Sequence, residues 1–154
     1  MLITTSLAFK APSLVFDSPQ AKELAIEALT HSSASATRNN TELAKIGEAA
    51  ARAVAFEALH QSPGKHSGKQ YNDISLAFAT KHLCAIAKKY NVNDAIRLGK
   101  GVPYISDEMS ARAVEGLLGA LKLSSGPEKL LQALKELGIV HLPDLVVTEP
   151  DWLA

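Results

Sequence analysis

The segment from Thr41 to Leu59 constrains the fold more than any other part of this chain. One side of this segment, taken as a helix, carries apolar residues at helical spacing: Leu43, Ile46, Ala50, Val54 and Ala58. The opposite side is also apolar but small, with Ala44, Ala49, Ala51 and Ala55. Because a helix that is apolar nearly all round is normally buried on all sides, we expect this segment to be the central helix of a bundle.

The rest of the sequence also predicts helices joined by short loops. Apolar periodicity and capping residues predict helices over 19–31, 41–59, 72–90 (with a break near 79–81), 107–123 and 128–137, and a short turn or helix over 94–98. Aromatic residues make up only 5% of the chain and alanine is abundant, which favours closely packed helices over a sheet. We therefore predict an all-α fold in one domain over residues 1–154, with a lead-in over 1–19 and a tail over 142–154.

Bulk properties limit the classes of protein to which the chain can belong. Lys+Arg and Asp+Glu are balanced at 16 each, whereas proteins that depend on phosphate contacts usually carry a basic excess. No apolar run is long enough to span a membrane, and the first residues lack the basic region and apolar core of a secretory signal. We expect an intracellular protein, cytoplasmic or mitochondrial, with no membrane partner. Its single cysteine, Cys84, is predicted to be a small buried hydrophobe.

Several segments carry recognisable motifs in a fixed order. They are Ala28-Leu-Thr-His-Ser-Ser33, Asn40-Thr-Glu-Leu-Ala-Lys-Ile-Gly-Glu48, Leu83 to Ala87 with Ile96-Arg-Leu-Gly-Lys-Gly101, and Ala111 to Leu121. At this spacing they resemble the ribonuclease III domain family, and Asn72-Asp-Ile74 resembles its small single-domain fungal members. The resemblance covers Ala28 to about Leu137. It implies an all-α ribonuclease III endonuclease-domain bundle without a double-strand RNA-binding domain.

The resemblance also implies a metal site, and most of its carboxylates are missing here. Members of the family hold divalent metal between carboxylates of two helices, and Mg²⁺ prefers oxygen ligands. Carried over to this chain, the acids belong at Thr41, Ala44, Glu48, Arg112 and Glu115. Only Glu48 and Glu115 are acidic. The neighbouring Glu42 is turned about 100° around the helix from position 41, so it does not replace the missing acid.

Arg112 has the opposite charge to the acid that the resemblance implies. A guanidinium stays charged and pairs bidentately with carboxylates, so we hypothesise that Arg112 neutralises Glu48 and Glu115 in place of a metal. The alternative is that Arg112 extends into solvent. His31 is either a general base facing the same cleft or a residue packed at the end of the first helix, and the resemblance favours packing. The predicted remnant of the catalytic site is therefore Glu48, Glu115, Arg112 and His31, without a bound metal.

Basic side chains outside this site are candidates for RNA contacts. We expect an RNA-facing patch at Lys65, Lys69, Arg97 and Lys100, with Lys88 and Lys89 as further candidates. The alternative is an ordinary solvated surface. His60, His66, His82 and His141 have no ligand-like spacing, so no zinc site is expected.

Dimerisation is a further property that the resemblance implies. The family inserts a large aromatic residue of the signature helix into a partner, and the matching position here is Lys45. Leu43, Ile46 and the nearby alanines still offer an apolar contact. We expect a homodimer, with a heterodimer between this chain and a ribonuclease III-like relative as the alternative.

Three functions fit the sequence. The first is a catalytically degenerate ribonuclease III-like module that binds double-stranded or ribosomal RNA or a protein partner. The second is an atypical, Mg²⁺-dependent double-stranded RNA endonuclease. The third is a scaffold recruited to metal-free acid–base chemistry on a small molecule in the old cleft. Of these we predict the first, without cofactor and without ribonuclease III activity.

Overall fold

The computed structural model describes residues 9–142, and within this range the protein is built from helices. The helices are α1 (Pro19–Ala28), α2 (Thr41–Gln61), α3 (Gly68–Leu76), α4 (Thr80–Lys89), α5 (Asp107–Ser125) and α6 (Pro127–Glu136), with one 3₁₀ turn, η1 (Asn93–Ala95), before α5. Between residues 9 and 142 the only β-type pairing is an isolated parallel bridge between Thr30 and Arg97. The predicted all-α class is confirmed.

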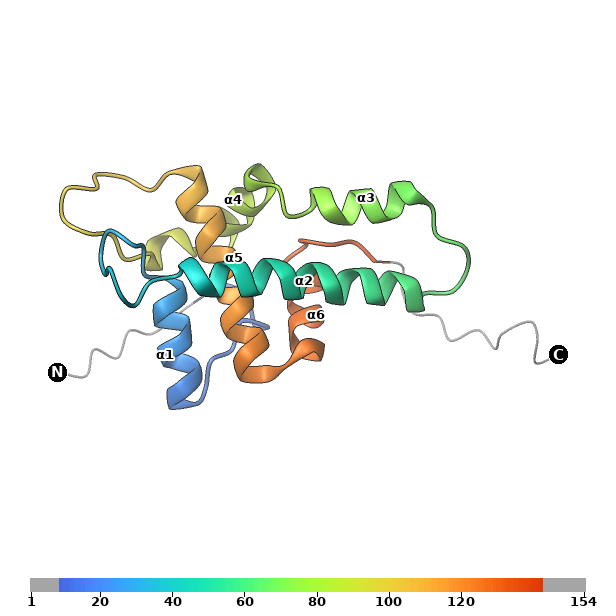
Figure 1. Cartoon of the computed structure of the whole chain (residues 1–154), viewed down its shortest axis with the longest axis horizontal. Helices are drawn as coiled ribbons and strands as arrows, with labels where there is room; N and C mark the ends of the chain where they lie inside the picture. Colours follow the sequence, from blue (N-terminus) through green and yellow to red (C-terminus); the bar gives the residue numbers. More distant parts are fainter. Residues whose placement is uncertain (1–8, 143–154) are drawn as a thin grey trace.

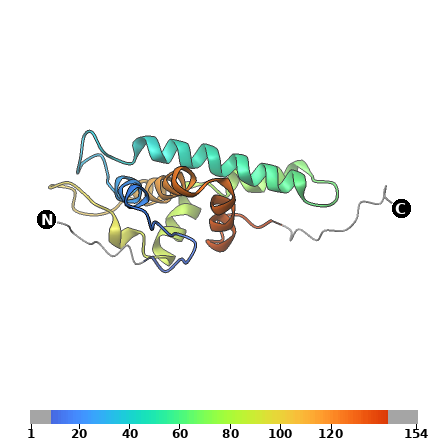
Figure 2. The same ribbon diagram turned by 90° about the horizontal axis from the view of Figure 1, so that it is seen from below.

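The α5 helix, rather than α2, lies at the centre of the bundle. Figures 1 and 2 show α2 running across α5 along one side of the molecule, with α1, α4 and α6 arranged around α5. Nearly every residue of α5 between Ser110 and Leu121 is buried. In contrast, Ile46 of α2 is 38% exposed, and Ala49 and Ala53 are exposed beside it. The small side chains on this outer face of α2 leave it open to solvent in the single chain.

Two glycines allow α2 and α5 to approach each other closely. A Cβ atom on Gly47 of α2 would overlap the carbonyl oxygen of Glu115, and one on Gly119 of α5 would overlap that of Leu43. The two backbones are therefore in direct contact at this crossing. As a result, residues next to Gly47 on α2 lie beside residues one turn before Gly119 on α5.

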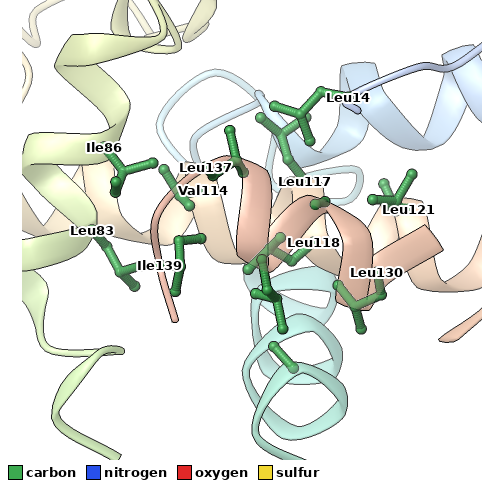
Figure 3. Packing of buried hydrophobic residues seen from close by; sticks show 14 of the residues in the cluster. Leu14, Leu83, Ile86, Val114, Leu117, Leu118, Leu121, Leu130, Leu137 and Ile139 are labelled. Atoms are coloured by element: carbon green, nitrogen blue, oxygen red, sulfur yellow. The ribbon is translucent and has the colours of Figure 1, made fainter. Parts of the chain in front are cut away.

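The hydrophobic core joins α5 to the helices on its inner side. Figure 3 shows Val114, Leu117, Leu118 and Leu121 of α5 packed among leucines and isoleucines of α4, of α6 and of the segments before α1 and after α6. The partners in the figure are Leu14, Leu83, Ile86, Leu130, Leu137 and Ile139, all buried. This packing fixes α5 and, through the glycine crossing, the position of α2.

The helix ends follow local hydrogen bonding. Ser18 and Ser106 cap α1 and α5 through their side chains. Asn40 precedes α2, but its side chain makes no capping bond; the backbone N–H of Thr41 donates to Oδ1 of Asn39 instead. A capping box at Ser67 starts α3 earlier than predicted.

The remaining helix ends agree with the predictions less evenly. The predicted break within 72–90 occurs at 77–79, between α3 and α4, and α1 ends at Ala28 rather than near residue 31.

Cys84 is 5% exposed, so it is a buried residue, as predicted.

Parts of the predictions concern residues outside the described range. The start of the lead-in over 1–8 and the tail residues 143–154 are not among the described residues, so the single-domain boundaries over 1–154 stay a prediction. Among residues 9–142, no helix combines the length and hydropathy needed to cross a bilayer.

Candidate functional site

The α2–α5 crossing brings the two remaining acids together. Glu48 follows Gly47 on α2, and Glu115 lies at the point of α5 that Gly47 touches. Both side chains are half-buried, and Glu48 is close enough to raise the pKa of Glu115. Two carboxyl groups in this position can share a proton, because two adjacent negative charges repel each other strongly in a partly buried site.

The pKa of Glu115 in this pair lies near neutral pH. Burial raises the pKa of Glu115 to about 7, and the charge of Glu48 and its hydrogen bond act in the same direction. The positive charges of Arg112 and Arg52 oppose this rise only in part. At neutral pH Glu115 is therefore only partly ionised.

A cation that the sequence analysis did not single out lies against the pair. Nη2 of Arg52 is 3.1 Å from Oε1 of Glu48, one helical turn earlier on α2. The guanidinium also lies over the ring of Phe78, 5.5 Å from its centre, and Nε is buried without a hydrogen-bond partner. The Glu–Arg spacing of four residues on one helix is the sequence signal for this contact.

Arg112 does not form the bridge that the sequence analysis hypothesised. Its side chain is exposed, and no ion pair within residues 9–142 involves it. Its charge still lowers the pKa of Glu115, so the two groups are near each other. Side chains on a helix point toward its N-terminus, so Arg112, one turn before Glu115, is directed away from the pair. The cation bonded to Glu48 is Arg52.

The other positions that match the family's acids supply no ligand. Ala44 is 7% exposed, with a methyl group in place of a carboxylate, and Thr41 is uncharged. Asp107, the acid at the start of α5, accepts a hydrogen bond from Sγ of Cys84 at 3.3 Å and so is directed toward α4. No group of three His, Cys, Asp or Glu side chains among residues 9–142 is arranged to hold a metal ion. The donor set falls short of the several oxygens that Mg²⁺ prefers.

His31 lies in the loop after α1 and is bonded within that loop. Its Nδ1 accepts from the backbone N–H of Ser33 at 3.1 Å and is 2.7 Å from Oγ of the same residue. With Nδ1 as acceptor, the ring proton belongs on Nε2. Ser33 Oγ in turn accepts from the N–H of Gly99 at 2.9 Å. This network ties two loops together and includes neither Glu48 nor Glu115.

The predicted RNA-binding residues lie at two ends of the molecule. Lys65 and Lys69 belong to the segment between α2 and the start of α3, at one end of Figure 1, whereas Arg97 and Lys100 precede α5 at the other end. Lys69 is paired with Asp73 at 2.8 Å. These residues do not form one continuous patch.

Comparison with solved structures defines the class of protein. Two structures of the nuclease domain of ribonuclease III from Campylobacter jejuni match this fold: one at 26% identity and TM-score 0.70, covering 81% of this chain and 90% of that one. The other matches at 25% identity and TM-score 0.64, covering 81% and 88% of the two chains. The first is described as showing structural flexibility in a region involved in dimer formation. The fold is thus that of a ribonuclease III nuclease domain.

Sequence comparison places the chain in a family. A sequence model of the Ribonuclease-III-like family matches residues 21–139, so the chain belongs to this family, and the predicted resemblance is confirmed. Ribonuclease 3 from Azotobacter vinelandii is 32% identical over 110 residues, which are 68% of this chain and 48% of that protein. The chain therefore spans about half the length of this curated relative. Membership of the small fungal subgroup stays a prediction.

Proposed function

We propose that this chain is a non-catalytic ribonuclease III-like module that binds RNA. One observation carries the proposal. At the crossing of α2 and α5, the chain has Thr41, Ala44 and Arg112 at positions where the family resemblance implies acids. A further acid, Glu48, is already bonded to Arg52. The residues present do not fit a divalent ion, because Mg²⁺ gives up its hydration shell reluctantly and needs several oxygen ligands.

The charge balance of the site supports binding without catalysis. Glu48 and the partly protonated Glu115 face the positive charges of Arg52 and Arg112, so the group of four is close to neutral or slightly positive. A cluster of bare carboxylates would repel RNA phosphates unless a metal were bound. A balanced cluster does not, so the phosphate backbone can approach this face without a metal.

We also propose that two copies associate through the outer face of α2. Leu43 is 4% exposed within its own chain, so it is not available to a partner, contrary to the sequence expectation. Ile46, Ala49 and Ala53 form the exposed apolar stripe instead. The likeness to a Campylobacter domain described by its region for dimer formation supports a homodimer. A heterodimer is the alternative, because the exposed Lys45 beside the stripe would face its own copy in a two-fold pair.

The binding half of the proposal is tested with duplex RNA and chelator. We expect the protein to bind a long RNA duplex equally well in EDTA and in Mg²⁺, with affinity falling as salt rises because phosphate contacts release counterions. The measurement is filter binding over a salt series. Absence of binding to any RNA would contradict the proposal and would favour a protein partner.

An atypical endonuclease is the second candidate. Membership of the Ribonuclease-III-like family and the contact between Glu48 and Glu115 favour it. This candidate requires that a metal displace Arg52 from Glu48, so it predicts cleavage that improves when Arg52 is removed.

Acid–base chemistry on a small molecule has less support. The raised pKa of Glu115 suits proton transfer near neutral pH. However, a cavity of about 430 Å³ lies elsewhere, beside α3, where Ile74, His82 and Ile139 are among its lining residues. An intracellular location, cytoplasmic or mitochondrial, stays a prediction.

A further inference from the structure

Two loops at one end of the molecule are joined into a single unit. The first, residues 29–40, connects α1 to α2, and the second, residues 96–106, leads into α5. The N–H of Arg97 donates to the oxygen of Leu29 at 2.8 Å, and the N–H of His31 donates to the oxygen of Arg97 at 3.0 Å. A Cβ on Gly99 would overlap the carbonyl of Ser33, so the backbones touch. We call residues 29–40 and 96–106 the loop pair; it projects from one end of the bundle (Figures 1 and 2).

The loop pair is basic in a chain that is neutral as a whole. It contains Arg38, Arg97 and Lys100, all exposed, and neither loop contains an acid. Acids flank the loop pair: Glu23 and Glu27 of α1 line a cavity of about 390 Å³ together with Arg38 and Arg97, and the exposed Asp107 and Glu108 follow the second loop at the start of α5. Lys100 is not part of that lining. Lys100 is therefore the cation of the loop pair that lies outside the cavity lined by the acids of α1.

An exposed aromatic side chain accompanies these cations. Tyr104, four residues after Lys100, is 74% exposed, the most exposed large apolar side chain among the described residues. Within residues 9–142 its ring stacks on no other ring or cation, and its hydroxyl has no hydrogen-bond partner. Both faces of the ring are thus available to a ligand.

We propose that the loop pair binds unpaired nucleotides of RNA, with Tyr104 stacking on a base and Arg38 and Lys100 contacting phosphates. This inference rests on the proposed RNA-binding function and names where and how a single strand is held. Aromatic rings among cations are the usual platform for single-stranded nucleic acid, since every base has a stacking face. Bases inside a duplex are already stacked and cannot reach Tyr104, so the site selects loops, bulges or single-stranded ends.

The other basic end of the molecule lacks this combination. Lys69 is neutralised by its ion pair with Asp73, and the exposed apolar side chain near it, Leu76, is aliphatic. Lys129 of α6 and Leu76 provide matched controls: an exposed cation and an exposed apolar residue outside the loop pair.

The test measures fluorescence anisotropy of a labelled oligouridine of about a dozen nucleotides, a length within the usual range of single-strand binding sites. A blunt RNA duplex of similar length serves as the second probe. We expect Tyr104→Ala to weaken oligouridine binding about tenfold, and Tyr104→Phe, which keeps the stacking face, to change it less than about twofold. Lys100→Ala should weaken binding and reduce its salt dependence. Leu76→Ala and Lys129→Ala should leave oligouridine binding unchanged.

The outcomes separate this inference from the proposed function. Wild-type protein that binds duplex but not oligouridine, or Tyr104→Ala that binds oligouridine as wild type does, would overturn the inference and leave the function standing. Loss of duplex and oligouridine binding to the same extent in Tyr104→Ala would overturn the selectivity for unpaired bases. Cleavage of duplex by the wild type would overturn the non-catalytic function but not the loop-pair site. Absence of binding to both probes would overturn both.

Discussion

Arg52 sets the chemistry of the site at the scale of single residues. It is paired with Glu48 and lies over the ring of Phe78, so the carboxyl group beside Glu115 already has a cationic partner. A metal ion would have to break this ion pair before it could use Glu48. The proposed loss of the metal site thus involves Arg52, one turn along α2 from Glu48, as well as the positions without acids.

Removal of Arg52 tests its contacts with Glu48 and Phe78 and the effect of its charge on the pKa of Glu115. A half-exposed ion pair and a cation–ring contact are each worth well under about 1 kcal/mol, so Arg52→Ala should lower the free energy of unfolding by roughly 1 kcal/mol. It should also raise the pKa of Glu115 further, since one of the two cations that lower it is lost. Urea denaturation and carboxyl NMR titration measure the two effects. Arg112→Ala is the matched control: unchanged stability is expected, and a loss as large as that of Arg52→Ala would contradict this account.

The raised pKa of Glu115 predicts how the stability of the fold depends on pH. The pKa is about 7 in the folded chain and near its ordinary value of 4.5 when unfolded. The folded state therefore binds more protons between these values, and wild-type stability falls as pH rises through this window. Glu115→Gln removes the ionisation, so it should gain stability relative to wild type from pH 5 to pH 8, by about 1 kcal/mol after discounting for partial exposure. Thermal denaturation over this range measures it; a constant difference would show that Glu115 does not titrate near 7.

The sequence identified part of the site at this scale. Glu48 and Glu115 could be named from their motifs, because a motif fixes positions on helices of known geometry. Arg52 could not, because a Glu–Arg spacing of four residues is common on solvated helix faces and carries no specific signal. The hypothesised bridge from Arg112 to the two acids was wrong. Side chains on a helix lean toward its N-terminus, which directs Arg112 away from Glu115.

At the scale of elements, the α2–α5 crossing depends on glycine. Gly47→Ala would place a methyl group on the carbonyl oxygen of Glu115, and backbone cannot move aside as a flexible side chain can. We expect a loss of about 3 kcal/mol in unfolding free energy, at the upper end of overpacking costs. Gly68→Ala is the control, because its Cβ would meet nothing within 4 Å and should be neutral or slightly stabilising. Equal urea midpoints for the two variants would contradict the close crossing.

Helix existence was predictable from periodicity, whereas the arrangement of helices was not. Alanines make a helix look apolar all round, but a small side chain costs little when exposed, so α2 could not be distinguished from a central helix by composition. The central position of α5 depends on four neighbours that approach it from distant parts of the chain. The start of α3 was missed because its capping box lies in a segment rich in glycine, which reads as a loop.

At the scale of the whole molecule, the outer stripe of α2 predicts self-association. Ile46→Asp places a charge within the exposed stripe formed with Ala49 and Ala53, and burying it between two copies would cost several kcal/mol. We expect wild type to sediment as a dimer at micromolar concentration and Ile46→Asp to sediment as a monomer. Leu123→Asp, at an exposed apolar position on α5, should stay dimeric. A wild-type protein that is monomeric under these conditions would contradict the proposed dimer.

The distribution of charge over the whole molecule also could not be read from the sequence. Lys65 and Lys69 are separated from Arg97 and Lys100 by the length of the bundle, and one of the four is already paired (Figure 1). Net charge says nothing about such placement, because distant segments come together only in the folded chain.

We propose that this chain keeps the family's fold without the family's metal chemistry. The direct test is incubation of the wild-type protein with long double-stranded RNA and Mg²⁺ or Mn²⁺, with products resolved on a denaturing gel. We expect no metal-dependent cleavage, and we expect that Arg112→Asp together with Ala44→Glu is needed before any product appears, because the site otherwise has too little negative charge to hold the ion. Wild-type protein that cuts the duplex, with cutting abolished by chelator and by Glu115→Gln, would contradict the account.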